Sequence, residues 1–218
     1  MKTKLVIFDL DGTLLDTLDD LATSVNHALQ QYSYPQHELA AYRYFVGNGI
    51  TKLIERALPE EARQEETIAR LRSTFVSHYQ THKTNLSKPY PGIPELLESL
   101  HRQNILLAVA SNKYHQGTVE LVRHFFGESL FAIVLGQREG IPVKPDPTII
   151  EEILAFSAVS KSETLYVGDS GIDMQAARNS AVTSVGVTWG FRPRQELEQN
   201  GASLIVDTPQ EIEAWING

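Results

Sequence analysis

The stretch Leu5–Thr13, LVIFDLDGT, decides the fold that we expect for this chain. Its first four residues are all apolar, which is typical of a strand covered on both faces in a parallel sheet. Asp9 and Asp11 follow at once, and Gly12 permits a tight turn out of the strand. Ligands of open parallel sheets bind at the carboxyl ends of the strands. We therefore predict that the loop up to Thr13 lies at a binding edge and contributes to ligand binding.

The two carboxylates of this loop suit phosphoryl transfer. A nucleophilic carboxylate can form a covalent phosphoenzyme, and a second carboxyl group nearby can act as an acid and then as a base. Two other interpretations compete. Asp11 and Gly12 could form an ordinary turn. The acids could also open a calcium-binding EF-hand loop, but the sixth position from Asp9 is Leu14, where that loop needs glycine.

Composition narrows the class of protein. The chain has 218 residues, 42% of them hydrophobic, which fits one globular domain or a domain with a smaller one inserted. Its net charge is −8 and it has no cluster of Lys and Arg, so nucleic acid and anionic membranes are poor partners. No apolar run approaches the roughly 18 residues of a membrane span, and cysteine is absent. We expect a cytoplasmic protein with a small-molecule partner.

Two kinds of pattern divide the chain. Residues 16–86 contain helical stretches such as LDDLATSVNHALQQY and no convincing strand, and they end at the proline-rich KPYPGIP. Apolar strands alternate with helices in the flanking residues 1–15 and 87–218. These patterns predict an α/β fold, a doubly wound Rossmann-like parallel sheet core with an inserted all-α domain. Further strands are expected at 105–110, 132–135, 164–167, 183–187 and 204–206, and helices at 93–100, 114–124, 147–156, 172–180, 193–199 and 209–216.

Polar residues also end the second predicted strand. Ser111 and Asn112 follow it directly, and a hydroxyl and an amide there could bind phosphate oxygens. The alternative is that they cap the next helix. Lys144 lies in VKPDP, where two prolines stiffen the backbone, and its ammonium group could neutralise a phosphate and an aspartate together. A lone lysine could equally be a solvated surface charge.

Acids follow a further apolar strand. Asp169 and Asp173 could stabilise the start of the next helix, or they could hold a divalent cation, because Mg²⁺ is bound by one or two carboxylates together with substrate phosphate and water. With Asp9 and Asp11 they would bring four negative charges into one crevice, and Lys144 returns one positive charge. A phosphate would be repelled from such a site without a bound dication. Charge balance therefore favours Mg²⁺.

The order of these motifs resembles the haloacid dehalogenase superfamily of phosphatases and phosphotransferases. The chain has DxDGT, a strand that ends in Ser, a Lys and GDxxxD, and the resemblance covers nearly all of it. In that family the motifs supply a nucleophile, an acid/base, groups that position the phosphoryl group, and metal ligands. Carried over in that order, the nucleophile is Asp9, the acid/base is Asp11, and the positioning groups are Ser111 and Lys144. The metal ligands are Asp169, Asp9 and the main-chain carbonyl of Asp11, while Asp173 is a direct or indirect metal ligand.

The helical insertion resembles the family's cap, which closes over the site and selects the substrate. Within it, GNGITKLIERAL at residues 47–58 is similar to a segment of bacterial phosphoglycolate phosphatases. Asn48, between two glycines, could reach a substrate carboxylate or could cap a helix. Asn112 and Thr13 are further candidates for substrate binding. The VKPDPTII stretch departs from the KPxPxPLL pattern of many phosphoglycolate phosphatases.

Several rival functions remain open. A sugar phosphomutase keeps both aspartates, and a pyrophosphatase, a 5′-nucleotidase and a catalytically silent phosphate-binding module are further alternatives. Dehalogenases and phosphonate hydrolases of the family lack the second carboxylate, so Asp11 argues against both. His78 and His82 have the spacing of metal ligands on a helix but no third candidate nearby. The expected function is a Mg²⁺-dependent phosphatase that works through an aspartyl-phosphate.

Overall fold

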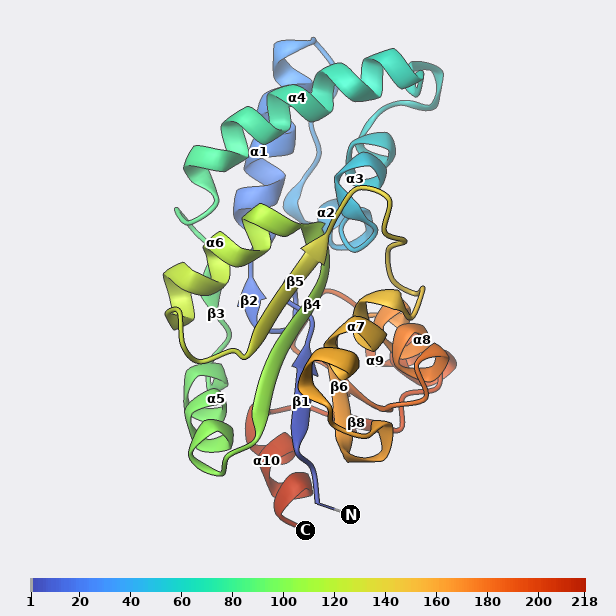
Figure 1. Ribbon diagram of the computed structural model, residues 1–218. Coiled ribbons are helices and arrows are strands. Elements are labelled where there is room, and N and C mark those ends of the chain that lie inside the picture. The colour runs from blue at the N-terminus through green and yellow to red at the C-terminus, as the bar shows by residue number, and fades with distance from the viewer. Residues whose placement is uncertain (1) are drawn as a thin grey trace.

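The computed structural model describes residues 2–218, and its core is a single parallel sheet (Figure 1). The six strands lie in the order β5-β4-β1-β6-β7-β8, and every neighbouring pair is parallel. This confirms the predicted α/β class and places the motif-bearing strand β1 at the centre. The strands are β1 (Leu5–Phe8), β4 (Leu106–Tyr114), β5 (Ile133–Gln137), β6 (Thr164–Gly168), β7 (Thr183–Val187) and β8 (Leu204–Val206).

Helices cover both faces of this sheet because its strands are apolar on both sides. In β1, Val6 and Phe8 pack in one hydrophobic cluster, while Leu5 and Ile7 pack in another on the opposite face. The core helices are α5 (Ile93–Arg102), α6 (His115–Phe126), α7 (Thr148–Ser157), α8 (Gly171–Asn179), α9 (Arg194–Gln199) and α10 (Pro209–Asn217), with a short 3₁₀ turn at Lys161–Glu163. Each lies within a few residues of its predicted bounds.

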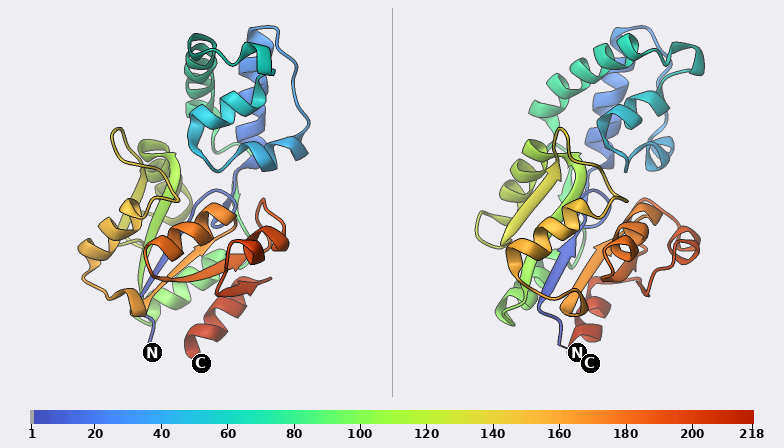
Figure 2. Two further views of the ribbon diagram at one scale, coloured as in Figure 1. Left: turned by 90° about the vertical axis from the view of Figure 1, so that its right-hand side faces the viewer. Right: turned by 45° about the vertical axis from the view of Figure 1, so that its right-hand side comes forward.

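A second group of helices lies beyond the carboxyl edge of the sheet, away from both termini (Figures 1 and 2). It consists of α1 (Leu18–Gln31), α2 (Leu39–Phe45), α3 (Gly49–Ala57) and α4 (Glu65–His82), with a 3₁₀ turn at Glu60–Ala62. We call these helices, residues 18–82, the cap. They bury a hydrophobic core of their own, whose largest members include Tyr42, Phe75 and Tyr79. The domain boundaries at residues 15/16 and 86/87 stay a prediction.

Two short strands link the cap to the core. β2 (Leu15–Asp16) and β3 (Lys88–Pro89) pair antiparallel, so the chain enters and leaves the cap along one narrow ribbon. The sequence did not predict this ribbon, because two-residue strands have no detectable period. Among residues 2–218, no helix combines the length and the apolar character needed to cross a membrane.

The second core strand is longer than predicted, and the difference affects two site residues. β4 continues to Tyr114, with an irregularity in its pairing with β5 between Ala110 and Tyr114. Ser111 and Asn112 therefore lie inside the strand and do not cap the next helix, whose first residue is His115. A bulge of this kind re-aims side chains at the edge of a sheet, so both residues face the site in place of the helix.

Candidate active site

Asp9 and Asp11 lie at the carboxyl end of β1, between β4 and β6. The main-chain N–H of Asp9 donates to Val167 O at 2.9 Å, which holds the residue in register with β6. Gly12 has a φ of +89°, and a Cβ added there would lie 2.4 Å from Asp169 Oδ2. Glycine is therefore required, both by the left-handed backbone and by the close approach of a second carboxylate.

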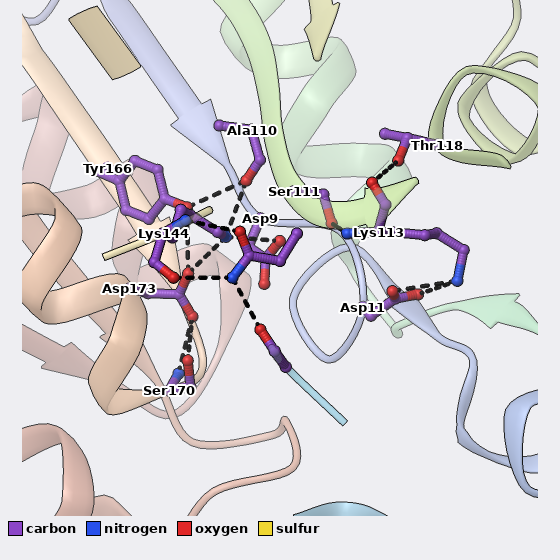
Figure 3. Close-up of polar contacts among 12 residues, drawn as sticks. Asp9, Asp11, Ala110, Ser111, Lys113, Thr118, Lys144, Tyr166, Ser170 and Asp173 are labelled. Atoms are coloured by element: carbon purple, nitrogen blue, oxygen red, sulfur yellow. Dashed lines mark hydrogen bonds and ion pairs between the residues drawn. The ribbon is translucent and has the colours of Figure 1, made fainter. Parts of the chain in front are cut away.

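Lys144 is a buried cation in the centre of the site and not a solvated charge (Figure 3). Its Nζ donates to Ala110 O at 2.9 Å, to the Tyr166 hydroxyl at 2.8 Å and to Asp173 Oδ1 at 2.8 Å. Asp9 Oδ1 lies 2.9 Å from the same Nζ. The three hydrogens of the ammonium group are used by Ala110, Tyr166 and Asp173. Asp9 is therefore attracted by the positive charge of Lys144 but accepts no hydrogen bond from it. Burial lowers the pKa of Lys144, but Asp173 and Asp9 outweigh it and hold the pKa well above its ordinary value.

Three carboxylates gather beside this lysine. Asp9, Asp169 and Asp173 each offer an oxygen within 4.8 Å of the others, so the group could hold a metal ion. Asp169 Oδ2 accepts from Phe191 N at 2.7 Å, and a Cβ on Gly190 would lie 2.3 Å from the Asp169 Cβ. The carboxylate of Asp169 is therefore held in a slot between two glycine backbones, where larger residues would displace it.

Asp173 uses both of its oxygens within the protein. Oδ1 accepts from Lys144 and from the Tyr166 hydroxyl, at 2.8 and 3.1 Å. Oδ2 accepts from Ser170 Oγ and Ser170 N, at 2.6 and 3.1 Å, in a capping box at the start of α8. The helix-capping interpretation therefore holds for Asp173, whereas the N-cap residue of α8 is Ser170 and not Asp169.

Burial makes full ionisation of this cluster costly. It raises the pKa of Asp9 to about 7 against the attraction of Lys144, and the Asp173 and Asp11 carboxylates add to the rise. Burial also raises the pKa of Asp169 well above its ordinary range, again with help from Asp173 and Asp9. A bound cation would favour the ionised carboxylates. A dication bound beside these carboxylates would therefore offset the cost of burying their negative charges.

Asp11 lies beside Lys113, on the other side of the site from Lys144 (Figure 3). Thr17 Oγ1 donates to Asp11 Oδ1 at 2.7 Å, and Lys113 Nζ lies 3.1 and 3.2 Å from the two carboxylate oxygens. Lys113 Nζ is also 4.7 Å from the centre of the Tyr79 ring. Asp11 is thus separated from Lys144 and held by a second buried cation.

Ser111 and Asn112 shape the middle of the site. The buried Ser111 Oγ accepts from Lys113 N at 3.2 Å. Asn112 Oδ1 accepts from Lys144 N at 2.8 Å, while Nδ2 donates to Lys144 O at 3.1 Å and to Gly47 O at 3.0 Å. Asn112 therefore fixes the loop that carries Lys144 and also joins it to the cap.

The structure does not bring Thr13 and Asn48 into the pocket described below. Thr13 is fully buried, and its main-chain O accepts from Trp189 Nε1 at 3.1 Å. Its Oγ1 has no hydrogen-bond partner within residues 2–218. Asn48 precedes α3 without a capping side-chain bond, and its Oδ1 accepts from Arg56 at 2.7 Å. Neither residue is among those that line the pocket.

A pocket opens between the sheet edge and the cap. The sheet contributes the polar side, and the cap contributes an apolar wall with one phenol. The lining residues are Asp9, Asp11, Leu21, Val46, Gly47, Gly49, Ile50, Leu53, Phe75, Tyr79, Ser111, Asn112, Lys113 and Tyr114. The arrangement can hold a small anionic molecule with one end at Asp9 and the other under the cap.

Sequence reasoning missed Lys113, Thr17 and Tyr166. Lys113 directly follows Ser111 and Asn112, so its place in the motif was the available signal. Thr17 is where the loop turns back beside Asp11, and that path cannot be read from spacing. Tyr166 places a hydroxyl in the buried strand β6, and a buried hydroxyl needs a hydrogen-bond partner. That requirement was the available signal, and Lys144 is the partner.

Comparison with known proteins identifies a family for this chain. The model of the haloacid dehalogenase-like hydrolase family matches residues 6–187. The chain is 36% identical over 194 residues to a phosphoglycolate phosphatase of Mannheimia succiniciproducens, across 86% of this chain and 87% of the relative. It is 33% identical over 214 residues to a phosphoglycolate phosphatase of Vibrio parahaemolyticus, across 96% of this chain and 94% of the relative.

Solved structures show the same fold. The crystal structure of a predicted phosphoglycolate phosphatase from Haemophilus somnus 129pt superposes with a TM-score of 0.92 at 30% sequence identity, and the match covers 99% of this chain and 98% of that one. The similarity therefore extends over the core and the cap together.

Proposed function

The chain belongs to the haloacid dehalogenase-like hydrolases and is a phosphatase, and from this premise we propose that it hydrolyses a small phosphate monoester through an aspartyl-phosphate at Asp9. The observation that carries the proposal is the position of Asp9. Its buried Oδ1 accepts no hydrogen bond from residues 2–218 and lies 2.9 Å from the Lys144 ammonium, and the residue borders the pocket. A carboxylate held at the edge of a pocket beside a fixed cation is suited to attack a phosphoryl group.

The residues divide the reaction into two steps. In the first, an oxygen of Asp9 attacks phosphorus, the bond to the ester oxygen breaks, and Asp11 donates a proton to the leaving alcohol. In the second, Asp11 takes a proton from water, which attacks the same phosphorus and releases inorganic phosphate from Asp9. The hydrogen bond from Thr17 and the contact with Lys113 hold the Asp11 carboxylate toward the cap, where the leaving group would lie.

The acidic residues fit Mg²⁺, a hard cation that takes oxygen ligands. We assign Asp9 and Asp169 to the ion, together with the main-chain carbonyl of Asp11. Asp173 is placed differently, because both its oxygens accept from Lys144, Tyr166 and Ser170. We assign it to holding Lys144. When bound, Mg²⁺ would neutralise the negative charge that Asp9 and the phosphoryl oxygens bring together.

We propose phosphoglycolate, or a phosphate ester of similar size, as the substrate. The names of relatives that are 36% and 33% identical support this choice. The pocket supports it as well, because it has cationic and acidic groups on the sheet side and is lined by apolar side chains of the cap on the other.

The test is release of inorganic phosphate from a panel of small esters with and without Mg²⁺. We expect Asp9→Asn to lower turnover by about 10⁴-fold or more, and Asp207→Asn, an exposed carboxylate paired with Arg194, to leave it unchanged. Acid-quenched protein should carry a phosphoryl group on the peptide that contains Asp9. Near-normal turnover of Asp9→Asn would refute the covalent mechanism, and phosphoryl transfer within a sugar phosphate without phosphate release would identify a phosphomutase.

A further inference from the structure

The pocket between sheet and cap contains one cationic side chain. Of the residues that line it, only Lys113 carries a positive charge, and its side chain is 4% exposed. Its three N–H donors have one acceptor group within residues 2–218, the Asp11 carboxylate at 3.1 and 3.2 Å. Lys113 therefore has donor capacity left for a second anion in the pocket.

A second unused donor lies beside it. Tyr79, from α4, is fully buried and lines the pocket, and its hydroxyl has no hydrogen-bond partner among residues 2–218. Burial and the nearby Asp11 carboxylate raise the pKa of Tyr79 well above its ordinary value, so the hydroxyl stays protonated. A buried hydroxyl without a partner costs free energy, which a ligand oxygen would recover.

The remaining side chains of the cap wall carry no polar group. They are those of Leu21, Val46, Ile50, Leu53 and Phe75, and Gly47 and Gly49 contribute main chain alone. Burying a carboxylate against these apolar side chains, which offer no donor, is unfavourable. A second anionic group on the substrate therefore has one favourable place under the cap, next to Lys113 and Tyr79.

We propose that Lys113 and Tyr79 bind the carboxylate of the substrate and select phosphate esters of 2-hydroxy carboxylates. This inference rests on the function proposed above, in which Asp11 protonates the ester oxygen. In such an ester, one carbon separates that oxygen from the carboxylate. A lysine 3.1 Å from Asp11 is within reach of a carboxylate at this distance, whereas a longer chain would press it against the apolar wall.

The first test compares kcat/KM for phosphoglycolate with kcat/KM for ethyl phosphate, which has the same number of carbons but no carboxylate. Lys113→Met keeps an unbranched side chain of similar length and removes the charge. Any effect through Asp11 falls on both substrates and cancels in their ratio. We expect the ratio to fall by about 10- to 100-fold, mostly through KM for phosphoglycolate. Lys52→Met, an exposed cap lysine paired with Glu55, should leave the ratio unchanged.

Tyr79→Phe is the cleaner variant, because the lost hydroxyl makes no hydrogen bond in the described structure. We expect it to lower the same ratio by about 3- to 10-fold while the protein folds normally. Tyr42→Phe removes a hydroxyl that donates to Asn26 inside the cap, away from the pocket, and serves as the matched control. An ester with one more carbon before its carboxylate, 3-phosphooxypropionate, should lose the advantage over its uncharged analogue.

A binding experiment separates this inference from the proposed reaction. Calorimetry on Asp9→Asn with Mg²⁺ should show tighter binding of phosphoglycolate than of ethyl phosphate, and the preference should vanish in Asp9→Asn/Lys113→Met. If the binding preference for phosphoglycolate is absent, or survives loss of Lys113, the inference is wrong. The proposed phosphatase activity would still stand if hydrolysis of ethyl phosphate depended on Asp9. A preference that disappears with Lys113 supports the inference even if no ester is hydrolysed.

Discussion

The carboxyl edge of the sheet and the wall of the cap face each other across one pocket, but their buried polar groups differ in whether they have hydrogen-bond partners. At the sheet edge, Lys144 donates all three of its N–H groups, to Ala110, Tyr166 and Asp173. On the cap side, Tyr79 has a buried hydroxyl with no partner among residues 2–218. The edge around Lys144 is preorganised by its own hydrogen bonds, whereas Tyr79 of the cap and Lys113 of β4 keep donor capacity for a ligand. Substitutions around Lys144 should therefore affect chemistry and stability, and those at Tyr79 and Lys113 should affect selectivity.

The largest effect is expected for Lys144→Met. Removing the ammonium leaves Asp173 buried without its cation, which should lower the free energy of unfolding by about 3–5 kcal/mol. Denaturant unfolding measures this loss. The matched control is Lys161→Met, whose pair with Glu151 is half exposed and should be worth less than about 1 kcal/mol. Equal losses for the two lysines would contradict the contrast between the sheet edge and the surface.

Gly12→Ala should be next in size. A Cβ at this position would lie 2.4 Å from Asp169 Oδ2 and push that carboxylate out of its slot, so we expect about a 100-fold loss of kcat. Gly140 also has a positive φ, +75°, but its Cβ would meet nothing within 4 Å. Gly140→Ala should therefore show backbone strain of about 1–2 kcal/mol with unchanged kcat. Similar kcat values for both variants would refute the slot.

The sequence predicted the sheet edge far better than the cap wall. Asp9, Asp169 and Lys144 were found because strand ends in a parallel sheet share one edge, so order along the chain becomes proximity in space. Lys113 and Tyr79 meet only when α4 packs over β4, and no spacing along the chain encodes that contact. Asn48 was chosen from a local motif, but its Oδ1 accepts from Arg56 and the residue does not line the pocket.

A smaller effect is expected at the junction of the two regions. Asn112→Ala removes the bond to Gly47 O and leaves the N–H of the buried residue Lys144 without its acceptor. We expect a loss of about 1–3 kcal/mol and faster hydrogen exchange at residues 46–49 of the cap. Asn179→Ala removes one exposed bond to Pro145 O and is the control. Unchanged exchange at 46–49 would show that the cap is held by other contacts.

The smallest effect concerns the cap alone. His78 stacks between His27 and His82, at 4.2 and 3.9 Å between ring centres. Burial, then these two neighbours, lower the pKa of His78 from its ordinary value of 6.5. The unfolded chain then binds more protons than the folded one just below pH 6.5, so stability falls as the pH drops through that window.

His78→Gln should reduce this pH dependence by no more than about 0.5 kcal/mol, because the ring is only partly buried. Thermal unfolding between pH 5 and 7 measures the change. His101→Gln, on the exposed side of α5, should leave the slope as it is. A steeper slope in His78→Gln would mean that the stack is stabilised by protonation.

The ribbon of β2 and β3 affects how the cap can change during evolution. The chain leaves the core at Leu15–Asp16 and returns at Lys88–Pro89, two segments that lie side by side. An insertion whose ends are adjacent can be lengthened, shortened or exchanged without moving any strand of the sheet. The cap and the catalytic core can therefore change independently in evolution. The same sheet can keep its reaction while different caps select different substrates.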